Sequence, residues 1–347
     1  MKLTSRQIFL LSLISILFLL SVAQFLKGDL DDGIGVRNLE APYHVLLTVE
    51  ALKNSPIENH YLLPSVSLGL TEDKFISWGA TVPTETGDYV YTSFNSPGFI
   101  LPYLWFEITG LDVNIQNLAY LNSILGVLVV LILLAMMFEV LTRFLNYSHA
   151  RAGLVTTIAL IPAIFSHEVL VSHGLVFWVH SFYQFIFVAT LYAMLRWFKA
   201  DTNNGKKSWA LILIVLLFLG PYTEWTGFIF NIGLFFVLMA LSFVRSSLIP
   251  NPKRLALLVA FLTTVAGCLM VAHYAIAVGF WPAIEAFQSR FFARSTTRGS
   301  FPGLFIGYLQ SYGYFLLIFC ASLFYLATNY FRQQTADSRQ QTADKLF

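Results

Sequence analysis

Charged residues are scarce in this chain. Only 12% of its 347 residues are Asp, Glu, Lys or Arg, whereas 57% are hydrophobic. An ordinary soluble domain has about 25% charged residues, which its water-facing surface requires. The scarcity of charge therefore excludes a soluble globular protein of this length.

The chain also has few cysteines and a small net charge. Cys268 and Cys320 are the two cysteines, and both lie within apolar runs, which argues against a disulfide framework or a thiolate metal site. The net charge of +2 is too small to indicate a nucleic-acid partner.

Long apolar runs are what the chain has instead. A membrane-spanning helix needs about 20 apolar residues. The sequence therefore predicts an all-α polytopic membrane protein with about eight transmembrane helices, the first of them an uncleaved signal anchor. The run 209–220 is short and is expected to form a tight hairpin with the next one. The expected spans are 8–26, 117–141, 153–170, 181–198, 209–220, 226–244, 255–279 and 306–329.

The basic residues set the expected orientation. Cytoplasmic loops are enriched in Lys and Arg, and placing both termini in the cytoplasm puts 14 of the 21 basic residues inside. The same orientation puts 15 of the 19 acidic residues outside. We therefore expect an integral protein of the plasma or inner membrane with its functional site on the external, periplasmic side.

One expected external loop, 27–116, is much longer than the others. Its apolar segment 97–110 is too short for a span and contains two prolines, so a helix lying at the membrane surface is favoured. Residues 1–330 are expected to form a single transmembrane domain. Residues 331–347, which contain a repeated RQQTAD motif, are expected to be a polar cytoplasmic tail.

Ionisable residues near the membrane are costly and are therefore functional candidates. Asp32 and Glu40 follow the first apolar run, where partial desolvation raises the pKa of a carboxyl group and suits it to general-base catalysis. Arg37, Tyr43 and His44 surround Glu40 and are candidate substrate contacts. A solvated turn is the alternative for the aspartate.

A second expected external segment carries His167, Glu168, His173 and His180. Imidazole and carboxylate groups are ligands of divalent metals, but the spacing matches no HExxH motif because Val171 stands where the second histidine would be. A divalent metal site and a substrate-binding role for His167, Glu168 and His180 both stay open, and no resident cofactor is assigned.

Two further groups of residues have side chains suited to ligand binding, the first to a sugar and the second to a phosphate. Tyr222, Glu224 and Trp225 combine rings that stack on sugars with a carboxylate that accepts hydroxyl hydrogen bonds, the alternative being an aromatic belt. Arginines at four-residue spacing would share one helix face and bind a lipid phosphate bidentately, or attract head groups generically. These arginines are Arg290, Arg294 and Arg298, and His273 is expected to be a core histidine with satisfied nitrogens.

The arrangement resembles the GT-C glycosyltransferase superfamily, in particular its protein O-mannosyltransferase and aminoarabinose transferase branch. The Asp-Glu-Ala-x-Tyr motif of that branch is matched by residues 39–43, Leu-Glu-Ala-Pro-Tyr, with Leu39 in place of the first acid. Its Pro-Pro-Leu segment is matched loosely by Ser96-Pro97-Gly98 and the residues that follow. The chain has fewer helices than the family usually has, so the resemblance is to a compact member.

The resemblance implies an inverting transfer of a sugar from a polyprenyl-phosphate donor to a lipid, glycan or protein acceptor. Glu40 would deprotonate the acceptor, alone or with a carboxylate from another loop, and the three arginines would stabilise the departing phosphate. Asp32 is the other candidate catalytic residue. Two other classes stay open. One is a transporter or flippase of a lipid-linked or anionic solute, and the other is a non-catalytic lipid-binding scaffold.

Overall fold

The computed structural model describes residues 4–34, 40–74, 80–166, 170, 177–200, 202–243 and 251–296, without the side chains of 28–34, 291 and 293–296. The chain divides into two compact units, Met1–Arg294 and Ser295–Phe347. The description below concerns the first unit and the end of its last helix. The expected span 306–329 and tail 331–347 lie outside the described residues.

Helices form at the other seven expected runs, and the protein is an all-α membrane protein with one small β-hairpin. In the described part of the chain, five helices are long and apolar enough to cross a membrane, so the count of eight stays a prediction. These five are Ser5–Lys27, Ile115–Arg143, Asn203–Thr223, Trp225–Phe243 and Pro252–Val278. The seven helices are α1 (Ser5–Ile34), α5 (Ile115–Arg143), α6 (His149–Phe165), α8 (Val179–Lys199), α9 (Asn203–Thr223), α10 (Trp225–Phe243) and α11 (Pro252–Val278).

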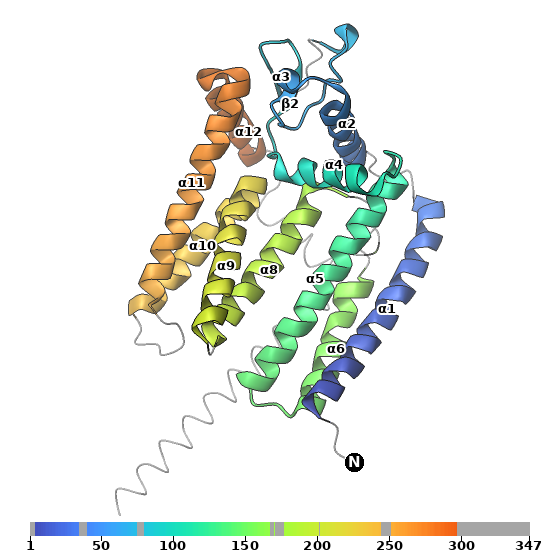
Figure 1. Ribbon diagram of the computed structural model, residues 1–347, viewed down its shortest axis with the longest axis vertical. Coiled ribbons are helices and arrows are strands. Elements are labelled where there is room, and N and C mark those ends of the chain that lie inside the picture. The colour runs from blue at the N-terminus through green and yellow to red at the C-terminus, as the bar shows by residue number, and fades with distance from the viewer. Residues whose placement is uncertain are drawn as a thin grey trace, which may run out of the picture. The chain divides into compact units, whose positions relative to one another are not determined.

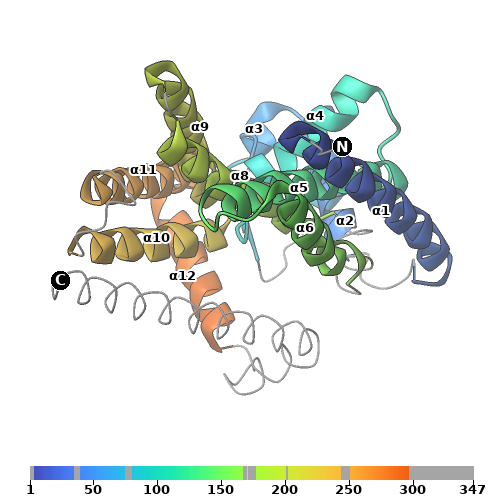
Figure 2. The ribbon, with the colours of Figure 1, turned by 90° about the horizontal axis from the view of Figure 1, so that it is seen from below.

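The seven helices pack in two groups joined by α8 (Figures 1 and 2). The first group, α1, α5 and α6, buries aliphatic side chains such as Ile16, Leu134 and Leu160. The second, α9, α10 and α11, packs against α8 around Leu213, Val259 and their neighbours. Their other faces are apolar and exposed, which is the pattern of helices that lipid surrounds.

The α9–α10 hairpin is as tight as the sequence indicates. Gly227 packs directly on the backbone of Gly220, because a Cβ atom at Gly227 would lie 2.3 Å from the carbonyl carbon of Gly220. The helix that contains the run 209–220 is longer than the run itself, because Thr202 caps it by accepting a hydrogen bond from the Gly205 N–H at 3.1 Å. A polar first turn therefore precedes the apolar residues.

The 27–116 loop folds into several short elements at one end of the helices, here called the loop end (Figure 1). Strand β1 (Thr81–Pro83) pairs antiparallel with β2 (Tyr89–Tyr91), with Val82 opposite Val90. At the same end the chain continues from α11 into α12 (Phe280–Thr296). The remaining elements of the loop are α2 (Glu40–Asn54), α3 (Ile57–His60), the 3-10 turn η1 (Thr71–Asp73) and α4 (Pro97–Thr109).

Helix α4 is the segment expected to lie at the membrane surface. Its 13 residues extend only about 20 Å at 1.5 Å per residue, which is less than the roughly 30 Å of a hydrocarbon core. The helix begins at Pro97 and ends where Gly110 adopts a left-handed conformation. It contacts α2, α5, α8 and α9, so it lies across the ends of the bundle helices rather than between them (Figure 1).

Candidate functional site

Glu224 is the single residue between α9 and α10, and its carboxylate is buried at the loop end. Only 3% of its surface is exposed. Its backbone N–H donates to the Gly220 carbonyl at 3.1 Å, and its own carbonyl accepts from the Gly227 N–H at 3.0 Å. The hairpin geometry therefore fixes the backbone from which this side chain extends.

His180, in the first turn of α8, pairs with this carboxylate. Its Nδ1 lies 2.7 Å from Glu224 Oε1, and the Thr226 hydroxyl donates to the same oxygen at 2.8 Å. Glu224 Oε2 is buried and has no hydrogen-bond partner among the described residues. The imidazole itself is half exposed and packs edge-on against the Phe94 ring.

This pairing determines what the imidazole can do. A carboxylate only accepts hydrogen bonds, so Nδ1 of His180 carries a proton, and Nε2 of the neutral ring carries the lone pair. A buried carboxylate that orients an imidazole in this way also stabilises the imidazolium formed when Nε2 takes a proton. The pair therefore has the geometry of a general base whose reactive nitrogen lies on the partly exposed ring.

A buried polar segment, Thr92–Ser96, connects this pair to α12. The Asn95 N–H donates to the Thr223 carbonyl at 3.3 Å, next to Glu224. Two residues earlier, the Ser93 hydroxyl accepts a hydrogen bond from Arg290 Nε at 2.9 Å. One rigid segment thus positions a carboxylate–imidazole pair and an arginine.

Histidine 273 lies beside the same segment and has both ring nitrogens bonded. Its Nε2 is 2.7 Å from the Tyr61 carbonyl, which can only accept, so Nε2 carries the proton. Its Nδ1 then accepts from the Tyr222 hydroxyl at 3.1 Å. Both ring nitrogens are therefore satisfied, as expected, while the residue itself is only partly buried.

The residues around the start of α2 lie in two different environments. Glu40 lies exposed on the protein surface at the first position of the helix, and Tyr43 is exposed as well. His44 is buried among aromatic rings, 4.5 Å from Tyr91 and 5.9 Å from Trp178 between centroids. Burial lowers the pKa of His44 to about 4, which keeps the ring neutral.

The aromatic rings expected to stack on a sugar pack partly against other rings of the protein. Tyr222 stacks on Phe218 at 5.4 Å, and Trp225 packs against Phe228 and Phe287. Both rings are half-buried. They line the hairpin on either side of Glu224 and help to hold it.

The remaining predicted residues are described in part or not at all. Helix α12 (Phe280–Thr296) includes Arg290 and Arg294, so the condition under which these two would share a face is met, although the side chain of Arg294 is not described. Asp32 belongs to α1, again without a described side chain. Arg37, His167, Glu168, His173 and Arg298 lie outside the described residues.

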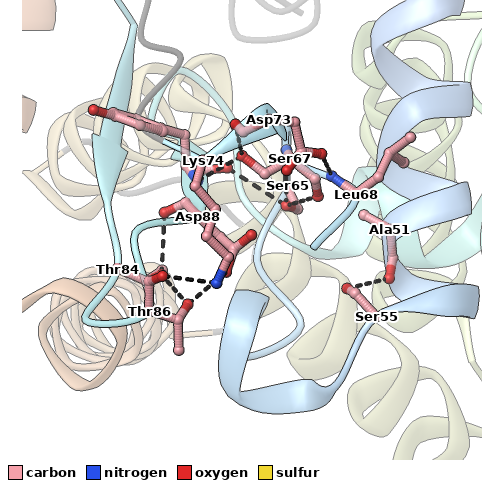
Figure 3. Close-up of polar contacts among 11 residues, drawn as sticks. Ala51, Ser55, Ser65, Ser67, Leu68, Asp73, Lys74, Thr84, Thr86 and Asp88 are labelled. Atoms are coloured by element: carbon pink, nitrogen blue, oxygen red, sulfur yellow. Dashed lines mark hydrogen bonds and ion pairs between the residues drawn. The ribbon is translucent and has the colours of Figure 1, made fainter. Parts of the chain in front are cut away.

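Figure 3 shows a second buried carboxylate, Asp88, in the turn between β1 and β2. Its Oδ2 lies 3.3 Å from Lys74 Nζ and accepts from the Thr86 hydroxyl at 2.6 Å. Lys74 also donates to the Thr86 carbonyl at 2.8 Å. These contacts attach the residue after η1 to the hairpin turn, so Asp88 stabilises the loop and is separate from the Glu224 pair.

No group of three or more His, Cys, Asp or Glu side chains that could hold a metal ion occurs within the described ranges. Sequence reasoning missed Ser93, Asn95 and Thr226. Their signal is present, because polar residues interrupt an otherwise aromatic and apolar stretch at both places. No protein-family model, curated protein or solved structure matches the chain.

Proposed function

We propose that this protein is a membrane glycosyltransferase that moves a sugar from a polyprenyl-phosphate donor to a lipid, glycan or protein acceptor. The observation that carries the proposal is that one buried segment, Thr92–Ser96, contacts His180 through Phe94, the residue before Glu224 through Asn95, and Arg290 through Ser93. A base for the acceptor and a cation for the leaving phosphate are the two groups that such a transfer requires.

The reaction is a direct displacement. Nε2 of His180 takes the proton of the acceptor hydroxyl, and Glu224 stabilises the resulting imidazolium through Nδ1–H. The acceptor oxygen forms a bond to the anomeric carbon while the bond to the phosphate oxygen breaks. The phosphate leaves with that electron pair, and the configuration at the anomeric carbon inverts. The guanidinium of Arg290, oriented by Ser93, stabilises the charge on the departing phosphate.

This assignment moves the base from Glu40 to the His180–Glu224 pair. Glu40 is exposed at the start of α2, so packing does not hold its carboxylate in one orientation. His180 is oriented by a buried carboxylate and therefore meets the positional requirement of a general base better. Glu40, which the family resemblance favours, becomes the comparison residue of the test.

The proposed site belongs to the external side of the membrane. The loop end carries α2, α4, the β-hairpin and α12, while the basic ends of α5 and α8, at Arg143 and Lys199, lie at the opposite end. The positive-inside rule assigns the basic end to the cytoplasm. Polyprenyl-phosphate sugars presented at the external leaflet would then reach the pair from the membrane surface, beside α4.

The test is turnover of a panel of polyprenyl-phosphate sugars by the purified protein in nanodiscs. We expect His180→Ala and Glu224→Gln to lower turnover by about 10²-fold or more, as loss of a general base does. Glu40→Gln should keep most of the activity. His149→Ala, at the first residue of α6 and the opposite end of the bundle, is the matched control.

The outcomes separate the three function classes. Release of polyprenyl phosphate with a glycosylated acceptor supports the proposal. Movement of the intact lipid-linked sugar between leaflets of proteoliposomes, without release of polyprenyl phosphate, identifies a flippase instead. Binding with neither turnover nor movement identifies a scaffold. A loss of turnover in Glu40→Gln alone would return the base to Glu40.

A further inference from the structure

A small cavity with a partly polar lining lies between α1, α5, α6 and the start of α8. It has a volume of about 50 Å³, enough for a few water-sized groups by the roughly 10–15 Å³ that each requires. Helices α1, α5, α6 and α8 all contribute to its wall. Its polar lining consists of Gln24, Lys27, Asn122, Ser123, Ser181 and Gln184.

Lys27 is the one cation of this lining. It is partly buried, and it makes no hydrogen bond or ion pair with another side chain in the described part of the chain. Other groups beside it are neutral amides and hydroxyls; the Ser123 hydroxyl, for example, donates to Gln24 Oε1 at 3.3 Å. A partly buried ammonium among neutral donors is a binding environment for an anion.

The cavity changes from polar to apolar along the helix axes. On α1, Lys27 and Gln24 stand toward the loop end, while Ala23 and Leu20 lie deeper. On α5, Asn122 and Ser123 likewise precede Val129 and Val130. The seven residues from Lys27 to Leu20 correspond to about 10 Å of helix. A charged head followed by an apolar stem is the polarity profile of a lipid at the membrane surface.

The wall is open where Gly126 of α5 contributes to it. Gly126 is exposed, and a Cβ atom built on it meets nothing within 4 Å. Its neighbours Ile124 and Leu128 are exposed apolar side chains. The opening therefore lies on an apolar face of the helix, where an acyl chain can lie against the protein.

We propose that this cavity binds the phosphate-bearing head group of a membrane phospholipid, with Lys27 as its charged contact and the acyl chain leaving past Gly126. Glu224 and Arg290 do not line this cavity, although Ser181 of its wall follows His180 in α8. The proposal does not depend on the proposed glycosyltransferase activity. Its lipid is a bound component of the folded protein, not the sugar donor.

Native mass spectrometry of the protein released from nanodiscs of phosphatidylcholine and phosphatidylglycerol tests this. We expect the wild type to retain one phosphatidylglycerol. Lys27→Met should reduce that retention by about tenfold or more, since it removes a hydrogen bond to a charged group. Gly126→Leu, which fills the opening, should do the same while leaving Lys27 in place. Gly233→Leu is the matched control, because a Cβ atom at Gly233 also meets open space.

Three results would overturn the proposal. The first is equal retention of phosphatidylglycerol in all variants that unfold at the wild-type temperature. The second is saturable binding of inorganic phosphate at Lys27 without any retained lipid, which would identify a free anion as the occupant. The third concerns Asp31, four residues after Lys27 in α1. Equal loss of thermal stability in Lys27→Met and Asp31→Asn, with lipid retention unchanged, would assign Lys27 to an ion pair within the helix.

Discussion

The hydroxyl of Tyr274 in α11 donates to the carbonyl of Tyr91 at 2.7 Å and lies 2.8 Å from the carbonyl of Phe94. Tyr274 is fully buried. One side chain of the bundle thus places its single hydroxyl hydrogen between two carbonyls, one at either end of the Thr92–Ser93 segment. The position of Ser93, and with it the contact to Arg290, depends on this attachment.

Tyr274→Phe should therefore destabilise the protein. The substitution keeps the ring packed against Phe287 but leaves buried carbonyls without their donor. Such a loss costs about 1–3 kcal/mol, which thermal unfolding in detergent measures. Tyr120→Phe, at an exposed position of α5, is the control and should change little. An unchanged unfolding temperature in Tyr274→Phe would mean that other contacts hold the loop on the bundle.

Gly227→Ala should disrupt the α9–α10 hairpin. The added Cβ atom would lie 2.3 Å from the carbonyl carbon and 2.4 Å from the carbonyl oxygen of Gly220, and backbone atoms cannot rotate away. Overpacking of this kind costs about 1–3 kcal/mol or more. The shift of Glu224 away from His180 should lower activity together with stability.

Gly233→Ala provides the contrast in the same helix. A Cβ atom there meets open space, and alanine favours a helix interior over glycine by about 0.5–1 kcal/mol. Thermal unfolding should therefore show a loss at position 227 and a neutral or positive change at position 233. Equal effects at both positions would contradict close packing of the two helices.

Features that depend on neighbouring residues, such as helices, could be predicted from the sequence. Contacts between residues far apart in the chain could not. The apolar run of α5, the break at Pro221–Gly227 and the shortness of α4 are each set by neighbouring residues, so the helices could be predicted. The pairing of His180 with Glu224 depends on the packing of α8 against α9, for which a single sequence carries no signal. Glu40 illustrates the same limit, because a motif match cannot report that its carboxylate is exposed.

Acid should destabilise the protein through His44. Burial lowers its folded-state pKa to about 4, against about 6.5 for a histidine in the unfolded chain. Between these values the unfolded state binds more protons, so the free energy of unfolding falls as pH falls from about 6.5 to 4. The full difference is on the order of 3 kcal/mol, and no further loss from this group follows below pH 4.

Denaturation of wild type and His44→Gln across that range isolates this contribution. The variant lacks a titrating ring and should show a flatter dependence on pH, although its stability at pH 7 is lower because the aromatic cluster loses a member. His149→Gln serves as the control and should keep the wild-type slope. Parallel curves for wild type and His44→Gln would mean that other groups cause the acid sensitivity.

The orientation proposed for the bundle is testable with single cysteines on a background in which Cys268 and Cys320 are serine. Glu85 is exposed at the turn between β1 and β2, and Asn203 is exposed at the start of α9, at the opposite end. In intact cells, a membrane-impermeant thiol reagent should label Glu85→Cys and spare Asn203→Cys until the membrane is opened. The reverse pattern would place the His180–Glu224 pair on the cytoplasmic side.

The role of Arg290 distinguishes a phosphate contact in the transition state from general attraction of anionic lipid. Lysine keeps the positive charge but lacks the planar guanidinium. It also lacks the Nε–H group that donates a hydrogen bond to the Ser93 hydroxyl. If the guanidinium stabilises charge that develops on the departing phosphate, Arg290→Lys should lower turnover at saturating donor by on the order of 10²-fold, as loss of one such donor does.

Ser93→Ala should give a smaller loss of the same kind, because it frees the guanidinium from its orientation without removing it. Arg294→Lys, four residues further along α12, and Arg298→Lys extend the comparison. Arg254→Lys, at an exposed position near the start of α11, is the control. Because a point charge attracts head groups as well as a fork does, full single-turnover rates in Arg290→Lys and Ser93→Ala would remove Arg290 from the chemistry and leave it as an interfacial anchor.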